Sequence, residues 1–210
     1  HAVVQKLVAE GRIGELRSLR AEFTIPRRPD HDIRHQAGLD GGALWDTGVY
    51  PVRAALHLLG PQLEAVGTVL THDPALGVDT HGAALLRTPF GVTAHLSFGL
   101  DHGYRSVYEL CGSAGRITVD RAFTPAADHP PLVRIETGTE RTDLRLDPYD
   151  QVAGSVSAFA AAVAAGGAPS RPSLLQAGLL AALRAAAAPP PPRAPRTPAH
   201  PPSPLGRSRP

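Results

Sequence analysis

Seven short strand-like segments follow one another between residues 63 and 146, and this succession is the strongest constraint on the fold. Each segment has six to ten residues, with apolar and polar side chains in the short-period pattern typical of a sheet. Short turns at residues 89–91, 112–115 and 137–138 join several of these segments. Strands joined by short turns are antiparallel. The sequence therefore predicts an antiparallel meander made of residues 63–70, 81–88, 91–100, 106–112, 115–122, 132–137 and 140–146.

Helical segments flank this meander on both sides. Residues 1–11 place apolar side chains at helical spacing, and residues 17–25 then switch to a period of two, which predicts a helix followed by a strand. Two alanine-rich helices are predicted at the other end, over 150–166 and 172–188. The first carries a stripe of Val152, Val156, Phe159 and Val163. The predicted class is α+β, an open and largely antiparallel sheet with helices on one face.

A helix is also predicted over residues 43–59, after a long loop at 26–42 that we interpret as functional. Pro51 lies inside this helix. Proline removes one backbone hydrogen bond and disfavours helical geometry at the preceding residue, so we expect a kink or restart at Tyr50 and Pro51.

The composition indicates one globular domain with a tail. Of 210 residues, 42% are hydrophobic, which suffices for a core in residues 1–187. Residues 188–210 are rich in Pro, Ala and Arg, and we expect a disordered tail, either natural or the product of a shifted reading frame. The tail has four arginines and no acid; without them the formal net charge of +2 becomes −2, which argues against nucleic-acid binding.

Few features of the sequence indicate the cellular compartment of the protein. The single cysteine, Cys111, excludes an internal disulfide, fits a reducing environment and is expected to be a small core residue. No apolar run has the length of a membrane span, and no signal-peptide pattern occurs, so a cytoplasmic protein is expected. Because the sequence starts at His1 directly in a helical pattern, we also expect it to be a fragment.

Three short motifs do not support the chemistry that they superficially suggest. "HDIRH" has His31 and His35 four residues apart, but nearby Pro29 and Gly38 argue against the helix that a zinc site needs, so no metal is expected. "CGSAG" lacks the glycine spacing of a nucleophile elbow. No G-x-G-x-x-G or P-loop occurs, so a nucleotide cofactor would be held mainly by something else.

The stretch "GGALWDTGVYP" offers a carboxylate, Asp46, and a phenol, Tyr50, one helical turn apart. A tyrosine can act as a general acid at a carbonyl, and a carboxylate on the same face could orient a substrate hydroxyl. The spacing alone leaves a second interpretation open, in which Tyr50 packs on the core and Asp46 satisfies backbone donors of the glycine turn.

Longer stretches carry a family resemblance. "KLVAEGRIGELRSLRAEF", "GGALWDTGVYPVRAALHLLG", "GRITVDRAF" and "DQVAGSVSAFAAAVAAG" resemble the C-terminal domain of the Gfo/Idh/MocA oxidoreductases, which use NAD(P) and act mostly on sugars. Residues 25–61 and 86–131 are most similar to the NDP-hexose 3-ketoreductases of deoxysugar biosynthesis. The resemblance covers about residues 1–183.

The resemblance implies roles for particular residues. The family's glycine turn followed by D-x-G-x-[HY] falls on Gly41, Gly42, Asp46 and Tyr50, so Tyr50 would protonate the C3 oxygen while NADPH delivers hydride to C3, and Asp46 would order the cleft. Asp40 stands where family members usually carry a first glycine. Apart from the resemblance, Arg34 is a candidate contact for phosphate or cofactor because it lies in the loop before this turn, and the alternative is an arginine that is simply solvated there.

The resemblance also implies what lies elsewhere. The family's dinucleotide fingerprint and catalytic lysine belong to an N-terminal domain, and the single lysine here, Lys6, has the wrong context. We therefore expect a truncated NADP-dependent sugar oxidoreductase, inactive alone, with a nucleotide-sugar substrate and a homo-oligomeric partner on the sheet face. The alternative is a non-enzymatic oligomerisation or binding module built on that face.

Overall fold

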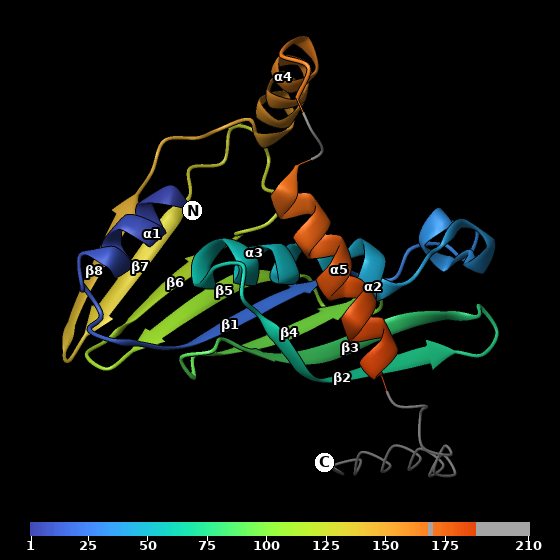
Figure 1. Cartoon of the computed structure of the whole chain (residues 1–210), viewed down its shortest axis with the longest axis horizontal. Helices are drawn as coiled ribbons and strands as arrows, with labels where there is room; N and C mark the ends of the chain where they lie inside the picture. Colours follow the sequence, from blue (N-terminus) through green and yellow to red (C-terminus); the bar gives the residue numbers. More distant parts are fainter. Residues whose placement is uncertain (168–169, 188–210) are drawn as a thin grey trace, which may run out of the picture.

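The computed structural model describes residues 1–167 and 170–187, and it forms one sheet with helices (Figure 1). The predicted disordered tail, residues 188–210, lies outside the described residues. The helices are α1 (Ala2–Ala9), α2 (Ala43–Asp46), α3 (Val49–Leu59), α4 (Gln151–Ala164) and α5 (Arg171–Ala186), with 3-10 turns η1 (Ile33–His35) and η2 (Ala37–Leu39). The strands are β1 (Leu16–Thr24), β2 (Glu64–Asp73), β3 (Val78–Arg87), β4 (Thr93–Gly99), β5 (Arg105–Gly112), β6 (Arg116–Asp120), β7 (Leu132–Thr137) and β8 (Glu140–Arg145).

The eight strands form a single sheet in the order β2-β3-β4-β1-β5-β6-β7-β8. β1 lies parallel to β4 and antiparallel to β5, with Leu19 opposite Ala94 on one side and Leu110 on the other. The other neighbouring pairs are antiparallel. The meander predicted from the sequence is thus interrupted once, because the first strand inserts between the fourth and the fifth.

Apolar side chains of one sheet face form the core, and α1, α3 and α5 cover them (Figure 1). Burying a leucine or phenylalanine fully stabilises the fold by about 1.5–3 kcal/mol. The α+β class predicted from the sequence is confirmed. The buried set includes Val4 and Leu7 of α1, Val52 and Ala55 of α3, Leu180 and Leu183 of α5, and Leu19, Phe23, Leu96, Phe98, Tyr108 and Leu110 of the strands.

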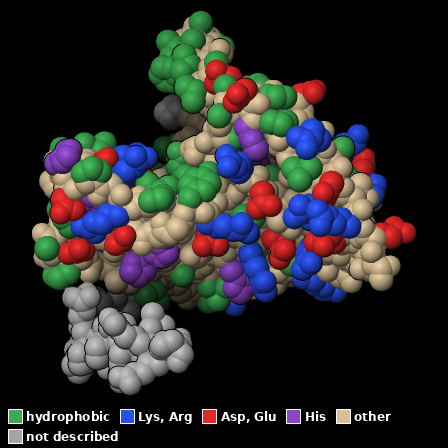
Figure 2. All heavy atoms as spheres, turned by 180° about the vertical axis from the view of Figure 1, so that it is seen from behind, with side chains coloured by type: hydrophobic (Ala, Val, Ile, Leu, Met, Phe, Trp, Pro, Cys, Tyr) green, Lys and Arg blue, Asp and Glu red, His purple; other side chains and the backbone are tan. Residues whose placement is uncertain are grey.

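The opposite sheet face is open and carries many charged side chains (Figure 2). Cross-strand pairs such as Arg116 Nε with Glu136 Oε2, 2.7 Å apart, lie there. Cys111, expected as a core residue, also lies on this face and is half-buried, because the neighbouring Leu110 takes the core-facing position. Its thiol donates to Glu109 Oε1 at 3.2 Å, and burial together with that carboxylate raises the pKa of the thiol.

The helix predicted over residues 43–59 is two helices, so the predicted restart occurs, but it lies at residues 47–48 and not at Tyr50 and Pro51. The chain breaks earlier, at Thr47 and Gly48, whose amides both donate to Ala43 O. An added Cβ on Gly48 would lie 2.6 Å from Leu44 O, so only glycine fits this tight connection. Pro51 falls in the first turn of α3, where a missing N–H breaks no helical hydrogen bond.

α4 is the exception to the packing of helices on the sheet. None of its residues is buried, and Figure 1 shows it projecting from the rest of the fold. Among the described residues, no helix is both long and apolar enough to cross a membrane.

Candidate active site

The glycine turn before α2 brings three segments into close contact. An added Cβ on Gly41 would lie 2.6 Å from Arg34 O, and one on Gly42, whose φ is +124°, would collide with the carboxylate of Asp79. That carboxylate accepts a hydrogen bond from Leu44 N at 2.7 Å and so satisfies a free amide of α2. The two glycines therefore let the 26–42 loop, α2 and β3 meet.

Asp40 precedes these glycines with φ +54° and ψ +37°. Aspartate tolerates this left-handed conformation better than most residues. Asp40 stands where family members usually have a glycine, and its backbone can still adopt the conformation that this turn needs.

Arg34 joins the loop to the end of α2 through two carboxylates. Its Nε donates to Asp46 Oδ2 at 2.9 Å, and its Nη1 donates to Asp32 Oδ1 at 3.1 Å. Asp32 Oδ1 also accepts from Arg34 N at 3.0 Å, and this backbone hydrogen bond, followed by the guanidinium, lowers the pKa of Asp32. The side chains of Arg34 and Asp46 are about one-third exposed, at 33% and 32%, so the pair remains open to a ligand.

Tyr50 projects from the first turn of α3 into a cavity of about 180 Å³. Its ring packs edge-on against Phe23, with centroids 4.8 Å apart, and lies 6.0 Å from the ring of Phe123. Aromatic pairs at these distances and tilts stabilise one ring orientation. The remaining wall of the cavity comes from His1, Arg53, Ala54, His57, Leu58, Ala122 and Gln151.

The environment of Tyr50 raises the pKa of its phenol. Burial is the main cause, the negative charge of Asp46 adds to it, and the positive charge of Arg34 opposes it. The phenol is therefore protonated at neutral pH. In chemical terms it can donate a proton, and a further positive charge beside it would help to stabilise the phenolate that remains.

Within the described part of the chain, no lysine supplies a positive charge beside the phenol of Tyr50. Lys6 lies on α1, where its Nζ is 3.8 Å from Glu10 Oε1 and the side chain is mostly exposed. The structure therefore brings together Arg34, Asp46 and Tyr50, with Gly41 and Gly42 shaping the turn beside them, but not Lys6.

The "HDIRH" segment contributes to this site through its charged residues. Its last three residues form η1, and Asp32 caps that turn. His35 is buried, and its ring nitrogens have no hydrogen-bond partner among the described residues. No cluster of three or more His, Cys, Asp or Glu side chains suited to a metal occurs in residues 1–167 and 170–187.

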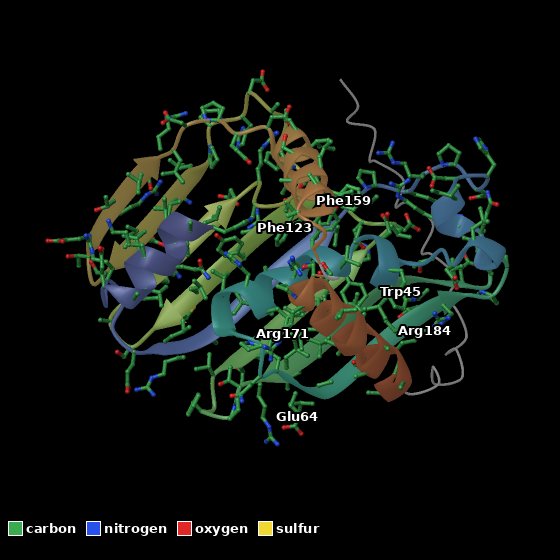
Figure 3. The ribbon with its side chains drawn as sticks, turned by 45° about the horizontal axis from the view of Figure 1, so that its top comes forward. Trp45, Glu64, Phe123, Phe159, Arg171 and Arg184 are labelled. Atoms are coloured by element: carbon green, nitrogen blue, oxygen red, sulfur yellow. The ribbon has the colours of Figure 1, made fainter. Side chains whose placement is uncertain are left out.

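Sequence reasoning missed Asp79 and the two phenylalanines that hold Tyr50. An acid flanked by Val78 and Thr80 in a strand was a usable signal for Asp79, because a buried carboxylate needs a partner. Phe123 gave no signal, since it follows β6 in an irregular segment. Trp45, beside Asp46, lies on the side of α2 toward α5 (Figure 3) and packs on the core.

Comparison with known proteins identifies relatives of this chain. The chain is 50% identical over 166 residues to a dTDP-3,4-didehydro-2,6-dideoxy-alpha-D-glucose 3-reductase of Streptomyces antibioticus. This match covers 79% of this chain and 51% of that protein. It is 48% identical over 186 residues to the enzyme of that name from Actinomadura kijaniata, covering 87% and 56%. The chain thus spans about half the length of these curated relatives.

Solved structures give the same match. The crystal structure of KijD10, a 3-ketoreductase from Actinomadura kijaniata in complex with NADP and TDP-benzene, superimposes with a TM-score of 0.86 at 48% identity, over 89% of this chain and 58% of that one. The model of the GFO/IDH/MocA C-terminal domain matches residues 1–118, more than half of the sequence. The chain therefore belongs to the Gfo/Idh/MocA oxidoreductase family, and it contains that family's C-terminal domain.

Proposed function

We propose that this chain is the substrate-binding and proton-donating half of an NADP(H)-dependent NDP-hexose 3-ketoreductase, which reduces the 3-keto group of a nucleotide-linked deoxysugar. The observation that carries the proposal is the Tyr50 phenol, which stays protonated in an aromatic cavity beside Asp46. The 48–50% identity to dTDP-3,4-didehydro-2,6-dideoxy-alpha-D-glucose 3-reductases supports it.

In this reaction the C3 carbonyl gains a hydride and a proton and becomes an alcohol. Bound NADPH would supply the hydride. Tyr50 gives its Oη proton to the C3 oxygen, and the phenolate regains a proton from solvent. Asp46, held by Arg34, orders the cleft in which the sugar is oriented.

The cofactor is held mainly by residues outside this chain, because the sequence has no dinucleotide fingerprint. Gly41, Gly42 and Arg34 face the substrate and cofactor at the edge of the site. Arg34 commits Nε and Nη1 to carboxylates, and its Nη2 remains for a phosphate oxygen.

Further parts of the proposal concern the whole protein. Residues 1–187 form the substrate-binding domain, and the open sheet face pairs with a second copy. The protein works in the cytoplasm, as its soluble sugar-nucleotide substrate requires. The non-enzymatic module remains the second candidate, favoured by the exposed face itself.

The experiment joins the chain to the nucleotide-binding half of a related 3-ketoreductase and measures NADPH oxidation with a TDP-linked 3-keto sugar. The fusion should be active, while the chain alone should neither turn over nor bind NADPH saturably. Tyr50→Phe should lower kcat by roughly 10²- to 10⁴-fold with little change in cofactor affinity, because a positioned general acid contributes about this much.

Asp46→Asn is the matched variant, and it should cost less than Tyr50→Phe because Asp46 orients the sugar and donates no proton. A Tyr50→Phe fusion with near-full kcat would remove Tyr50 from the mechanism. An inactive but folded fusion that still self-associates would favour the binding module.

A further inference from the structure

A second cavity adjoins the one that holds Tyr50. Its volume is about 520 Å³, and it lies between α3 and the first turns of α5. Arg53 and His57 line both cavities, so the two meet along α3. Sites for small organic ligands usually have volumes of about 300–1,000 Å³. The Tyr50 cavity, at about 180 Å³, therefore holds only part of a nucleotide-linked sugar, and the second cavity has room for the rest.

Both helices that form the second cavity contribute a positive charge to it. Arg53 comes from α3 and Arg171 is the first residue of α5, and both are exposed. Figure 3 shows Arg171 where α5 passes α3. No Asp or Glu is among the described residues that line this cavity. Two guanidinium groups without an acid beside them favour an anion, and the planar guanidinium matches the oxygens of a phosphate in particular.

The remaining wall of the second cavity is largely apolar. Leu56 and Pro61 contribute to it from the α3 side, and Pro172 and Leu175 contribute from α5. An inorganic anion held by the arginines would leave this apolar surface in contact with water. A nucleoside diphosphate combines an anionic group with a flat base that can cover such a surface. The composition of the cavity thus favours a nucleotide over a simple anion.

Arg53 is held in place by a neutral group. Its Nη1 donates to Gln176 Oε1 at 3.3 Å, and Gln176 Nε2 donates to Val49 O at 2.8 Å. The amide of Gln176 therefore links Arg53 to the first turn of α3 without neutralising its charge. Arg34 differs, because it already pairs with two carboxylates. Arg53 thus keeps its full positive charge for a ligand.

We propose that Arg53 and Arg171 bind the diphosphate of the nucleotide-linked sugar, and that the nucleoside covers the apolar wall of the second cavity. This rests on the proposed function, in which the keto sugar lies at Tyr50. Arg53 follows Tyr50 by three residues on α3 and so lies on the same side of the helix. The diphosphate is bonded directly to the sugar, so it must lie next to the Tyr50 cavity, where Arg53 lines the junction with the second cavity.

The test measures binding of dTDP to the chain by titration calorimetry, with dTDP as a probe that lacks the keto sugar. Saturable one-to-one binding is expected. Arg53→Gln and Arg171→Gln should each weaken it about tenfold or more, because a hydrogen bond to a charged group contributes about this much. Arg184→Gln is the matched control, since it removes the same charge near the other end of α5 (Figure 3) and should leave binding unchanged.

The diphosphate of a dinucleotide cofactor has the same chemistry, so the titration is repeated in the presence of NADP⁺, which should not displace dTDP. Displacement would assign the cavity to the cofactor and overturn the proposal. Absence of dTDP binding, or equal weakening by all three substitutions, would overturn it as well. Because binding is measured without turnover, a fusion that binds dTDP but reduces no 3-keto sugar would count against the proposed function and not against this site.

Discussion

At the scale of single residues, Asp79 shows how a distant side chain determines the start of a helix. Its carboxylate fills the space above Gly42 and accepts the Leu44 amide, although the two segments are far apart in the sequence. The helical spacing of Asp46 and Tyr50 after a glycine turn left two interpretations open, and the family resemblance supplied the roles predicted for them. Phe123 could not be identified in this way, because its contacts are set by tertiary packing and leave no local period, and for Asp79 the only local signal was its place between Val78 and Thr80 in a strand.

The charges around Tyr50 lead to a prediction about its ionisation. Arg34→Gln should raise the pKa of the phenol for two reasons. The substitution removes the positive charge that stabilises the phenolate, and it leaves the negative charge of Asp46 without its partner. Asp46→Asn should lower it, because the carboxylate destabilises the phenolate. The measurement is tyrosinate absorbance as the pH rises, with the titration of Tyr50→Phe subtracted.

The other groups around the cavity are His1, Arg53 and His57, and neither substitution alters them. Arg20→Gln, on the open sheet face, is the control and should leave the titration unchanged. Shifts of the same sign for Arg34→Gln and Asp46→Asn would contradict this account of the site.

At the scale of elements, short-range patterns predicted most strands and helices but not where one helix breaks. Proline suggested a bend at residue 51, whereas the connection depends on the close approach of Gly48 to Leu44 O. Likewise the apolar stripe of α4 correctly predicted a helix, but it did not predict whether another element covers the stripe. Contacts between segments decide both features, and periodicity does not encode them.

A comparison of two helical glycines tests the break between α2 and α3. Gly48→Ala should lower the free energy of unfolding by about 1–3 kcal/mol, because its new methyl group meets Leu44 O at 2.6 Å. Gly178→Ala in α5 should raise it by up to about 1 kcal/mol, because the methyl group meets nothing and alanine favours helix. Urea denaturation measures both, and equal effects of the two substitutions would refute the explanation.

At the scale of the whole molecule, the two unpaired surfaces differ in chemistry. α4 presents an apolar stripe without charged residues, whereas the open face combines charge pairs with exposed Val69 on β2. β8, at the far edge of the sheet, is exposed along its whole length and has four charged residues, which discourages strand addition there.

Self-association through the open face should therefore depend on Val69. Val69→Asp is expected to raise the dissociation constant of the homo-oligomer about tenfold or more, because it puts an unpaired charge into an apolar contact. Phe90→Asp, in the turn after β3 at 90% exposure, is the control and should have no effect. Sedimentation velocity over a range of concentrations gives the answer, and a monomer at every concentration would contradict it.

The insertion of β1 between β4 and β5 has a consequence for how the chain acquires its fold. β1 ends at residue 24, yet its two partner strands begin at residues 93 and 105, so its hydrogen-bonding edges have no final partner while the intervening chain is being synthesised. Pairings between such distant segments form slowly, because a long loop must close first. Since β1 alone connects the β2–β4 group to the β5–β8 group, neither group is complete without it, and the last step of folding should close both at once.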